Sequence, residues 1–293
     1  MTTPNLAVPT PYGRLYHKPG IDPATLPDHL TALQEGLLFP SVTNIIGVLD
    51  KPFLATWQAK EVALAAVDLA QTHPGLVVQK PKEAEKWLKA AADRKSKAAA
   101  ELGDLVHNTV EALAAGQEPT TELTAKAKLY VKSYHKFVAD YQPEFLHLES
   151  TCYGTVPTSR GELGYAGTAD FIARIDGKNY ICDWKTGRSI HTEAALQACA
   201  LAHATEIVDI DETRLEPMPQ IDGGLIVHLT PNGYFLYPAN IGDEPWETFG
   251  RLRDVWDFHQ ANLTSRTPLL LGDAVTGIAD LTNDPFTKGI DNE

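Results

Sequence analysis

A single stretch, GTADFIARIDGKNYICDWKTG at residues 167–187, constrains the fold more than any other part of the sequence. Its centre, Asp176-Gly177, is a preferred dipeptide for the type I′ turn of a two-residue β-hairpin. The residues on both sides are mostly β-branched or aromatic, which favours strands. If this dipeptide forms the turn, Ile175 pairs with Lys178, and the register of the whole hairpin follows.

That register brings two acidic side chains together. Asp170 lies directly opposite Asp183, with Cβ atoms about 4.5–5.5 Å apart, and Thr168 faces Lys185. Side chains alternate along a strand, so both carboxylates and the lysine share one face. Apolar residues occupy the neighbouring positions on both faces, so we expect the charges to be shielded from water. The alternatives are a solvent-facing hairpin end and a one-residue slip in register.

Two like charges directly opposite each other destabilise a sheet, so a compensating cation is expected here. Carboxylate oxygens are hard ligands that suit Mg²⁺ or Mn²⁺. The Asp-x-Lys pattern alone is weak, because it occurs three times in the chain. Only the copy that begins at Asp183 lies on a predicted strand with an earlier aspartate in register.

The pattern of the whole chain predicts a mixed α/β (α+β) domain with a helical N-terminal part. Residues 1–40 are rich in Pro, Gly, Thr and Leu and are expected to form an arm with little regular structure. Helices are expected over residues 42–49, 52–71, 81–115, 123–141, 192–204 and 243–263, and strands over 145–153, 165–175, 179–185, 223–230 and 233–239.

The net charge at first argues against a nucleic-acid partner. Lys and Arg number 25 against 38 Asp and Glu, a formal charge of −13. Residues 80–136, however, carry eleven basic and eight acidic side chains, a local charge of +3. These basic residues are candidates for phosphate contacts. The alternative is ordinary charge pairing on solvated helix faces.

Compartment is predicted from what the sequence lacks. No apolar run approaches the roughly 20 residues that span a bilayer, and the N-terminus has no signal-peptide pattern. The three cysteines are too scattered for a disulfide framework. We therefore expect a cytoplasmic protein with no membrane partner.

Four short motifs follow one another in a specific order. They are Gly103-x-x-x-His107, the GTAD that ends at Asp170, the DWKTG that begins at Asp183, and Gln197 on the next predicted helix. Across roughly residues 98–202 this order resembles the PD-(D/E)xK nuclease superfamily, specifically its RecB-like exonuclease branch from phages and bacteria. Leu201 stands where that family usually has Tyr, so its role is open.

The resemblance extends towards the N-terminus and implies a fold. The segment SVTNIIGVLDKPFLATWQAK resembles the N-terminal segment of phage-encoded and mitochondrial members of the branch. The implied fold is a restriction-endonuclease-like core, a mixed β-sheet flanked by helices, with helical N-terminal additions. The implied organisation is an N-terminal arm (1–40), a nuclease domain (41–265) with a helical part (41–142) and a catalytic core (about 98–240), and an acidic tail (266–293).

The implied activity is that of a metal-dependent DNA exonuclease. It would hydrolyse phosphodiester bonds from ends or single strands with Mg²⁺ or Mn²⁺, in recombination, replication or repair. A recombination or single-strand-binding protein is a further candidate partner. CRISPR-associated members carry four cysteines for an iron–sulfur cluster, and three do not fit that arrangement, so no cluster is expected. An endonuclease on the same core, a non-catalytic DNA-binding subunit and an acidic protein that binds no DNA remain alternatives.

The resemblance also implies roles for the central residues. Asp170 and Asp183 would bind the metal, and Trp184 would add its backbone carbonyl. Lys185 would orient the attacking water or stabilise the developing negative charge. His107 would be a further ligand, although a lone helix histidine is usually structural.

Other candidates are less specific. Glu149 either binds the metal or its water, or is an ordinary exposed glutamate. Gly103 would let strands or DNA approach closely, and Thr186 would support the site. Gln197 would support the site or contact the nucleic acid, and the alternative is an ordinary helix amide. Further candidates for DNA contact, each with an ordinary structural alternative such as a helix cap, a core aromatic or a solvated lysine, are Ser41, Thr43, Trp57 and Lys60.

Overall fold

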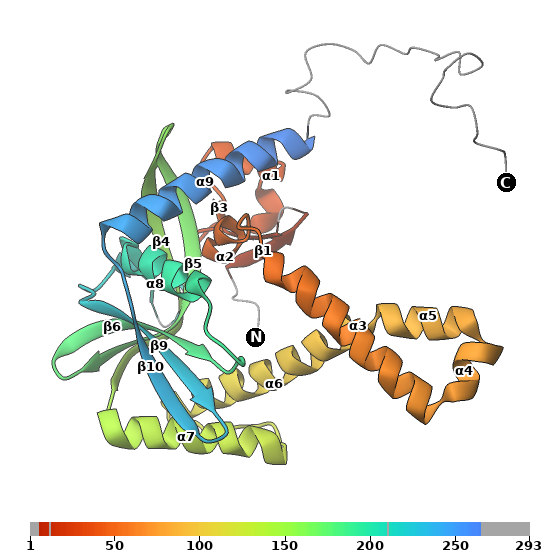
Figure 1. Cartoon of the computed structure of the whole chain (residues 1–293). Helices are drawn as coiled ribbons and strands as arrows, with labels where there is room; N and C mark the ends of the chain where they lie inside the picture. The colour runs from red at the N-terminus through yellow and green to blue at the C-terminus, as the bar shows by residue number, and fades with distance from the viewer. Residues whose placement is uncertain (1–5, 12, 210, 265–293) are drawn as a thin grey trace, which may run out of the picture. The chain divides into compact units, whose positions relative to one another are not determined.

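The computed structural model describes residues 6–11, 13–209 and 211–264 (Figure 1). Met1–Trp256 group into one compact unit and Asp257–Glu293 into a second. The fold and the site below concern the first unit. The predicted acidic tail, residues 266–293, lies outside the described residues.

Seven strands form one mixed sheet in the order β10-β9-β6-β5-β4-β7-β8. Neighbouring strands are antiparallel except β6 and β9, which run parallel. The predicted mixed α/β class is therefore confirmed. The strands are β4 (Glu144–Thr158), β5 (Gly161–Ile175), β6 (Lys178–Lys185), β7 (Glu206–Val208), β8 (Leu215–Pro217), β9 (Gly223–Thr230) and β10 (Gly233–Ala239).

Helices flank both faces of this sheet (Figure 1). The described helices are η1 (Pro23–Thr25), α1 (His29–Gln34), α2 (Val42–Ile46), α3 (Pro52–Thr72), α4 (Pro74–Gln79), α5 (Pro81–Lys89), α6 (Ala91–Ala114), α7 (Ala125–Tyr141), α8 (Thr192–Ala202) and α9 (Asp243–Thr264).

Two buried clusters fill the two faces of the sheet. Ile172 and Ile181 belong to the cluster with α2 and α8. Phe171, Cys182 and Trp184 belong to the cluster with α6 and α7. Because alternate residues of β5 and β6 enter opposite clusters, the hairpin is apolar on both faces, as predicted. This burial shields the charged side chains at the end of the hairpin.

The predicted hairpin register is correct where the two strands pair. Ile175 pairs with Lys178, and pairing continues in that register as far as Phe171 and Cys182. Asp176 and Gly177 both have positive φ, as a type I′ turn requires.

The predicted helix over residues 81–115 is two helices, α5 and α6, which meet at Ala90. The Arg94 guanidinium lies 4.1 Å from the centre of the Trp87 ring, and its Nη1 donates to the Trp87 carbonyl. That contact satisfies a carbonyl at the end of α5, and helix propensity does not report it. Pro74 also begins α4, a helix that is not among the predicted ones.

The N-terminal region contains more regular structure than expected. Strands β1 (Ala7–Thr10), β2 (Gly13–Tyr16) and β3 (Phe39–Pro40) form a small antiparallel sheet. Strands this short give too few alternating positions for a sequence signal. A parallel bridge between Ser41 and Ala166 joins the end of this region to β5. The N-terminal sheet therefore lies beside the central hairpin.

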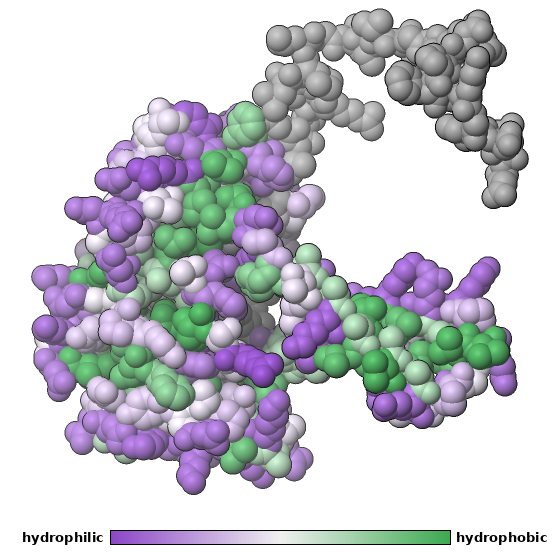
Figure 2. Space-filling view, in the orientation of Figure 1, coloured by the Kyte–Doolittle hydropathy of each residue, from purple (hydrophilic) through white to green (hydrophobic). Residues whose placement is uncertain are grey.

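The helices α3 to α5 pack against one another and carry exposed apolar side chains, visible as green patches over these helices in Figure 2. Among the exposed residues are Phe53, Leu64, Val67 and Val78. None of the described helices combines the length and apolar character of a membrane span.

Candidate functional site

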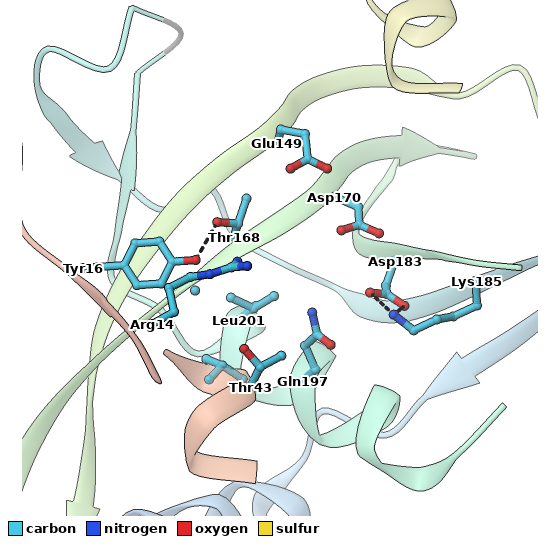
Figure 3. A pocket seen from close by; sticks show the side chains of 12 residues that line it. Arg14, Tyr16, Thr43, Glu149, Thr168, Asp170, Asp183, Lys185, Gln197 and Leu201 are labelled. Carbon is cyan, nitrogen blue, oxygen red and sulfur yellow. Dashed lines mark hydrogen bonds and ion pairs between the residues drawn. The ribbon is translucent and has the colours of Figure 1, made fainter. Parts of the chain in front are cut away.

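Side chains from separate parts of the chain line one cavity of about 160 Å³ (Figure 3). They come from the N-terminal sheet, from the first turn of α2, from strands β4, β5 and β6, and from α8. The lining residues are Arg14, Tyr16, Val42, Thr43, Glu149, Gly167, Thr168, Asp170, Asp183, Lys185, Gln197 and Leu201. The structure thus brings together the predicted Asp170, Asp183 and Lys185.

Backbone pairing between β5 and β6 ends just before the two aspartates. Phe171 and Cys182 are the last backbone pair. Beyond them, the Trp184 N–H donates to the side-chain Oδ2 of Asp170 at 2.7 Å and not to a backbone carbonyl of β5. The predicted pairings of Asp170 with Asp183 and of Thr168 with Lys185 are therefore wrong as strand pairs, although both aspartates line the same cavity. β6 continues beside β9 instead, where Lys185 pairs with His228. Separation of the two strands leaves room for the cavity.

His107, Glu149 and Asp170 form a compact group that could hold a metal ion. His107 Nε2 lies 3.1 Å from Glu149 Oε1 and 3.2 Å from Asp170 Oδ2. The three ligand atoms all lie within 4.8 Å of one another. His107 comes from α6, and the two carboxylates come from adjacent strands. Leu148 pairs with Phe171 and Ser150 with Ala169, so Glu149 lies opposite Asp170.

The orientation of these groups fits a cation better than a closed hydrogen-bond network. Both His107 ring nitrogens and Glu149 Oε1 are buried and have no hydrogen-bond partner. The short distances are therefore charge contacts whose angles do not make hydrogen bonds. Buried polar atoms are normally satisfied, and one imidazole with carboxylates is a donor set that Mn²⁺ or Mg²⁺ accepts. The residues present fit a divalent cation.

Asp183 stands slightly apart from that group. It is 4% exposed, and Lys185 Nζ contacts both carboxylate oxygens, at 2.7 Å for Oδ1 and 2.5 Å for Oδ2. The Trp184 indole packs on the opposite face, stacked on Phe171 with ring centres 4.2 Å apart. The predicted ligand roles of Asp183 and of the Trp184 carbonyl stay predictions.

Burial and crowding of like charges shift the titration of the acidic groups. Burial, followed by the Asp170 carboxylate, raises the pKa of Glu149 to about 8. The same two causes raise the pKa of Asp183 to about 7, although Lys185 opposes the shift. Both shifts express the cost of holding several carboxylates in a small buried volume, which the nearby His107 and Lys185 offset only in part.

The two cationic groups of the site hold their protons strongly. Burial lowers the pKa of His107, but Asp170, Glu149 and Glu111 outweigh burial and raise it to about 9. Burial likewise lowers the pKa of Lys185, while Asp183 and Asp170 raise it, for a net increase above its usual value. The lysine is therefore an ammonium ion at neutral pH.

Backbone geometry at Glu149 is unusual. Its φ is 46°, in the left-handed region that costs a non-glycine residue roughly 1–2 kcal/mol. Strain of this kind persists where surrounding structure imposes it, and it is common at ligand sites. Here it accompanies a carboxylate that contacts His107 and lines the cavity. Of the two interpretations, an ordinary exposed glutamate is wrong, because only 24% of the side chain is exposed.

Several site residues were not predicted, and two of them, Glu111 and Arg14, are charged. Glu111 lies one helical turn after His107, and its pKa is raised by burial and by Asp170. The i, i+4 spacing on a predicted helix was a signal that could have identified it. Arg14 lies in the segment predicted to be an irregular arm, and no local pattern indicated it.

The Arg14 side chain extends into the cavity on the side opposite Lys185 (Figure 3). Its backbone is held in place, because the Arg14 carbonyl accepts from Asn44 Nδ2 at 2.7 Å and from Ser41 N at 3.2 Å. Tyr16, on the same strand, shares a 3.1 Å hydrogen bond with Thr168. Among the described residues, no carboxylate forms an ion pair with the Arg14 guanidinium. A cation thus faces the acidic group without neutralising it.

The candidates for DNA contact separate in the structure. Ser41 is buried, and its Oγ accepts from Asn44 N at 3.0 Å. Ser41 is therefore the N-cap of α2, the structural alternative to DNA contact. Thr43 lines the cavity, and the Gln197 amide points into it (Figure 3). Trp57 is half-buried and Lys60 is exposed on α3, and neither lines this cavity.

Two glycines permit close approach around the site. A Cβ on Gly103 would lie 3.3 Å from Thr186 Oγ1, so α6 packs directly against the segment after β6. A Cβ on Gly167 would lie 2.9 Å from Leu201 Cδ2 and 3.0 Å from Val42 Cγ2. Leu201 is 3% exposed and forms part of the apolar wall beneath the cavity.

No protein-family model and no curated protein matches the chain. A solved structure described as "Crystal structure of SSO0001" is similar at 19% identity and a TM-score of 0.30. The similarity covers 45% of this chain and 58% of that one, so it spans somewhat more than half the length of that protein. A likeness of this size carries no argument about fold or function.

Proposed function

We propose that this protein is a metal-dependent deoxyribonuclease, an exonuclease that hydrolyses phosphodiester bonds at ends or on single strands. We also propose that its sheet and flanking helices are a restriction-endonuclease-like core. One observation carries the proposal. His107, Glu149 and Asp170 form a buried group suited to a divalent cation, and its two carboxylates line the same cavity as Lys185 and Arg14. That combination suits a phosphate ester.

Hydrolysis of a phosphodiester needs charge neutralisation on the phosphoryl oxygens, an in-line water and help for the leaving oxygen. A bound Mg²⁺ or Mn²⁺ would supply neutralisation and a more acidic water. His107, Glu149 and Asp170 would hold the cation, and Asp183 would be a further candidate ligand. Glu111 would keep His107 oriented from the next helical turn.

The cations of the cavity would act on the substrate itself. Lys185, charged and ion-paired with Asp183, would orient the attacking water or donate to a phosphoryl oxygen. Arg14, from the other side, would hold a substrate phosphate through its planar guanidinium. Gln197 and Thr43 would add neutral hydrogen bonds at the rim.

The decisive experiment is digestion of end-labelled single-stranded and double-stranded oligonucleotides, with closed circular DNA beside them, in Mg²⁺, Mn²⁺ or EDTA. We expect stepwise shortening of linear DNA that stops with EDTA and leaves the circle intact. Cutting of the closed circle would instead establish an endonuclease. Binding without cutting would favour a DNA-binding subunit, and the absence of both would favour a partner other than DNA.

The site predicts a specific pH dependence of metal binding. The folded-state pKa values of Asp183, Glu149 and His107, at about 7, 8 and 9, exceed the ordinary values of 3.8, 4.5 and 6.5. Without metal, the folded state therefore holds extra protons. The stability that these groups contribute is fully present below the ordinary values and is lost as the pH rises through about 7 to 9. Cation binding displaces protons, so its affinity rises with pH.

We therefore expect Mn²⁺ to raise the melting temperature little near pH 6 and by about 5–10 °C near pH 8.5. The larger shift corresponds to a Mn²⁺ concentration of roughly 100 times the Kd at that pH. Differential scanning fluorimetry across this range, with Ca²⁺-free and EDTA controls, measures the effect. A Tm increase that is largest at low pH would contradict the proposed proton displacement.

Substitution of Arg14 tests whether the substrate reaches across the cavity. We expect Arg14→Ala to raise KM for an oligonucleotide roughly ten- to a hundredfold with a smaller change in kcat, because a hydrogen bond to a charged group contributes about 1.5–3 kcal/mol. Arg14→Lys should retain part of the affinity, and Arg251→Ala, at an exposed arginine outside the cavity, is the matched control. An unchanged KM would remove Arg14 from the substrate site.

A further inference from the structure

A second cavity, of about 480 Å³, lies directly after the catalytic segment in the chain. Lys185 lines the first cavity, and the next three residues line the second. The lining residues of the second cavity are Lys95, Ala99, Leu102, Lys126, Tyr130, Thr186, Gly187, Arg188, His228, Leu229, Thr230 and Pro231. Three residues span at most about 11 Å. A nucleic-acid strand that leaves the first cavity along this segment therefore reaches the second cavity within a short distance.

The second cavity is basic, in contrast to the first. Its lining includes Lys95, Lys126 and Arg188 and contains no carboxylate. Lys95 is already paired with Glu61 at 2.6 Å. For Lys126 and Arg188, the described residues provide no ion-pair partner. Lys126 from α7 and Arg188 from the segment after β6 are therefore two exposed cations at one opening, where a single anion could contact both.

Two contacts hold the segment after β6 at this cavity. His228 is 6% exposed, and its Nε2–H donates to the Gly187 carbonyl at 2.7 Å, which holds the residue before Arg188. Gly103 lets α6 pack closely against Thr186 on the same segment. Arg188 is consequently presented from a segment attached to both β9 and α6, so little ordering is needed when an anion binds.

Apolar surface lies beside the two cations. Leu102, Tyr130 and the backbone around Pro231 complete the wall. A nucleotide has the same two parts, an anionic phosphate and a flat, largely apolar base. The volume of this cavity falls in the range of small-molecule sites, about 300–1,000 Å³. The cavity therefore has room for about one nucleotide and is too small for a duplex.

We propose that this second cavity binds the nucleotide next to the scissile phosphate on a single strand, with its phosphate between Lys126 and Arg188. The proposal rests on the proposed nuclease function of the first cavity. Two of the eleven basic residues between positions 80 and 136 line this cavity, Lys95 and Lys126, and the proposal selects Lys126 because Lys95 is paired with Glu61. The proposal also implies that base-paired substrates must separate before they occupy this cavity.

The test compares the wild-type protein with Lys126→Ala/Arg188→Ala and with the control Lys178→Ala/Arg251→Ala, which removes the same charge from exposed positions outside both cavities. Binding of a labelled single-stranded oligothymidine is measured by fluorescence anisotropy in Ca²⁺ over a range of salt. We expect the test variant to bind roughly tenfold more weakly, and its log–log salt slope to fall by about 0.7, since a single strand loses about 0.7 per phosphate contact and one phosphate lies between the two cations. The control should keep the wild-type slope.

A small phosphodiester separates the two cavities. Bis(p-nitrophenyl) phosphate reaches the first cavity but is too short to fill the second. We expect the test variant to hydrolyse it at the wild-type rate in Mn²⁺ while losing activity on the oligonucleotide. Thermal unfolding of each variant confirms that it is folded.

The outcomes distinguish the two proposals. Wild-type slope and affinity in the test variant would overturn the second-cavity proposal alone. Equal loss on both substrates would also overturn it, because the two residues would then act in the first cavity. A wild-type protein that hydrolyses neither substrate, yet binds the oligonucleotide through Lys126 and Arg188, would overturn the nuclease function and retain the binding site.

Discussion

Replacing Lys185 by Ala is expected to reduce DNA hydrolysis about 10²–10³-fold, the usual effect of removing one group that stabilises transition-state charge. Lys185 is the cation nearest the buried carboxylates, with Nζ 2.7 Å from Asp183 Oδ1. Its side chain is one-third exposed, so its ammonium can reach a substrate. The loss should appear in kcat, because the contact strengthens as negative charge develops.

Two comparisons isolate the charge of Lys185. Lys185→Met keeps most of the side-chain volume and removes the ammonium, so it should lose as much activity as Lys185→Ala. Lys178→Ala, at the exposed hairpin turn, should retain activity. Single-turnover rates on a labelled oligonucleotide, with Mn²⁺ affinity measured in parallel, provide the readout. An unchanged rate in either Lys185 variant would refute the proposed mechanism.

Replacing Asp170 by Asn is expected to weaken cation binding at least 100-fold and to reduce hydrolysis by a similar factor. Asp170 is the group common to the site, since it lies 3.2 Å from His107 Nε2 and accepts the Trp184 N–H at 2.7 Å. The Asn side-chain oxygen can still accept that N–H, so the hairpin should stay folded. The missing negative charge should be the principal change.

Isothermal titration with Mn²⁺ near pH 8 measures this effect, and Asp140→Asn provides the matched control at a partly exposed carboxylate paired with Lys136. Glu149→Gln should weaken binding less, because its pKa of about 8 leaves it partly protonated at that pH. Wild-type Mn²⁺ affinity in Asp170→Asn would show that the buried group does not hold the cation.

The central hairpin was predictable because its determinants are local. Asp176-Gly177 defines the turn, and a two-residue turn determines every pair that follows, so the register down to Phe171 and Cys182 came directly from the sequence. The proximity of Asp170 and Asp183 follows from the same register. The register did not predict that the strands separate at that point. The separation depends on a hydrogen bond from the Trp184 N–H to a side-chain acceptor, the Asp170 carboxylate.

His107 and Glu149 were proposed from a resemblance, and the structure places both beside Asp170. The resemblance could order the motifs along the chain but could not show which ligands meet. The structure groups His107 and Glu149 with Asp170, and pairs Asp183 with Lys185. This division depends on the position of α6 relative to the sheet, which is a matter of tertiary packing.

Local pattern by itself determined the turn, the register, the mixed α/β class and the acidic pair at the end of the hairpin. Only the tertiary structure placed Arg14 in the same cavity and set Lys126 opposite Arg188. The physical reason is the range of the interactions. Turn and strand preferences act over a few residues, whereas these cations reach the site through the packing of a short N-terminal sheet and of α7 against distant strands, and no local sequence period records those contacts.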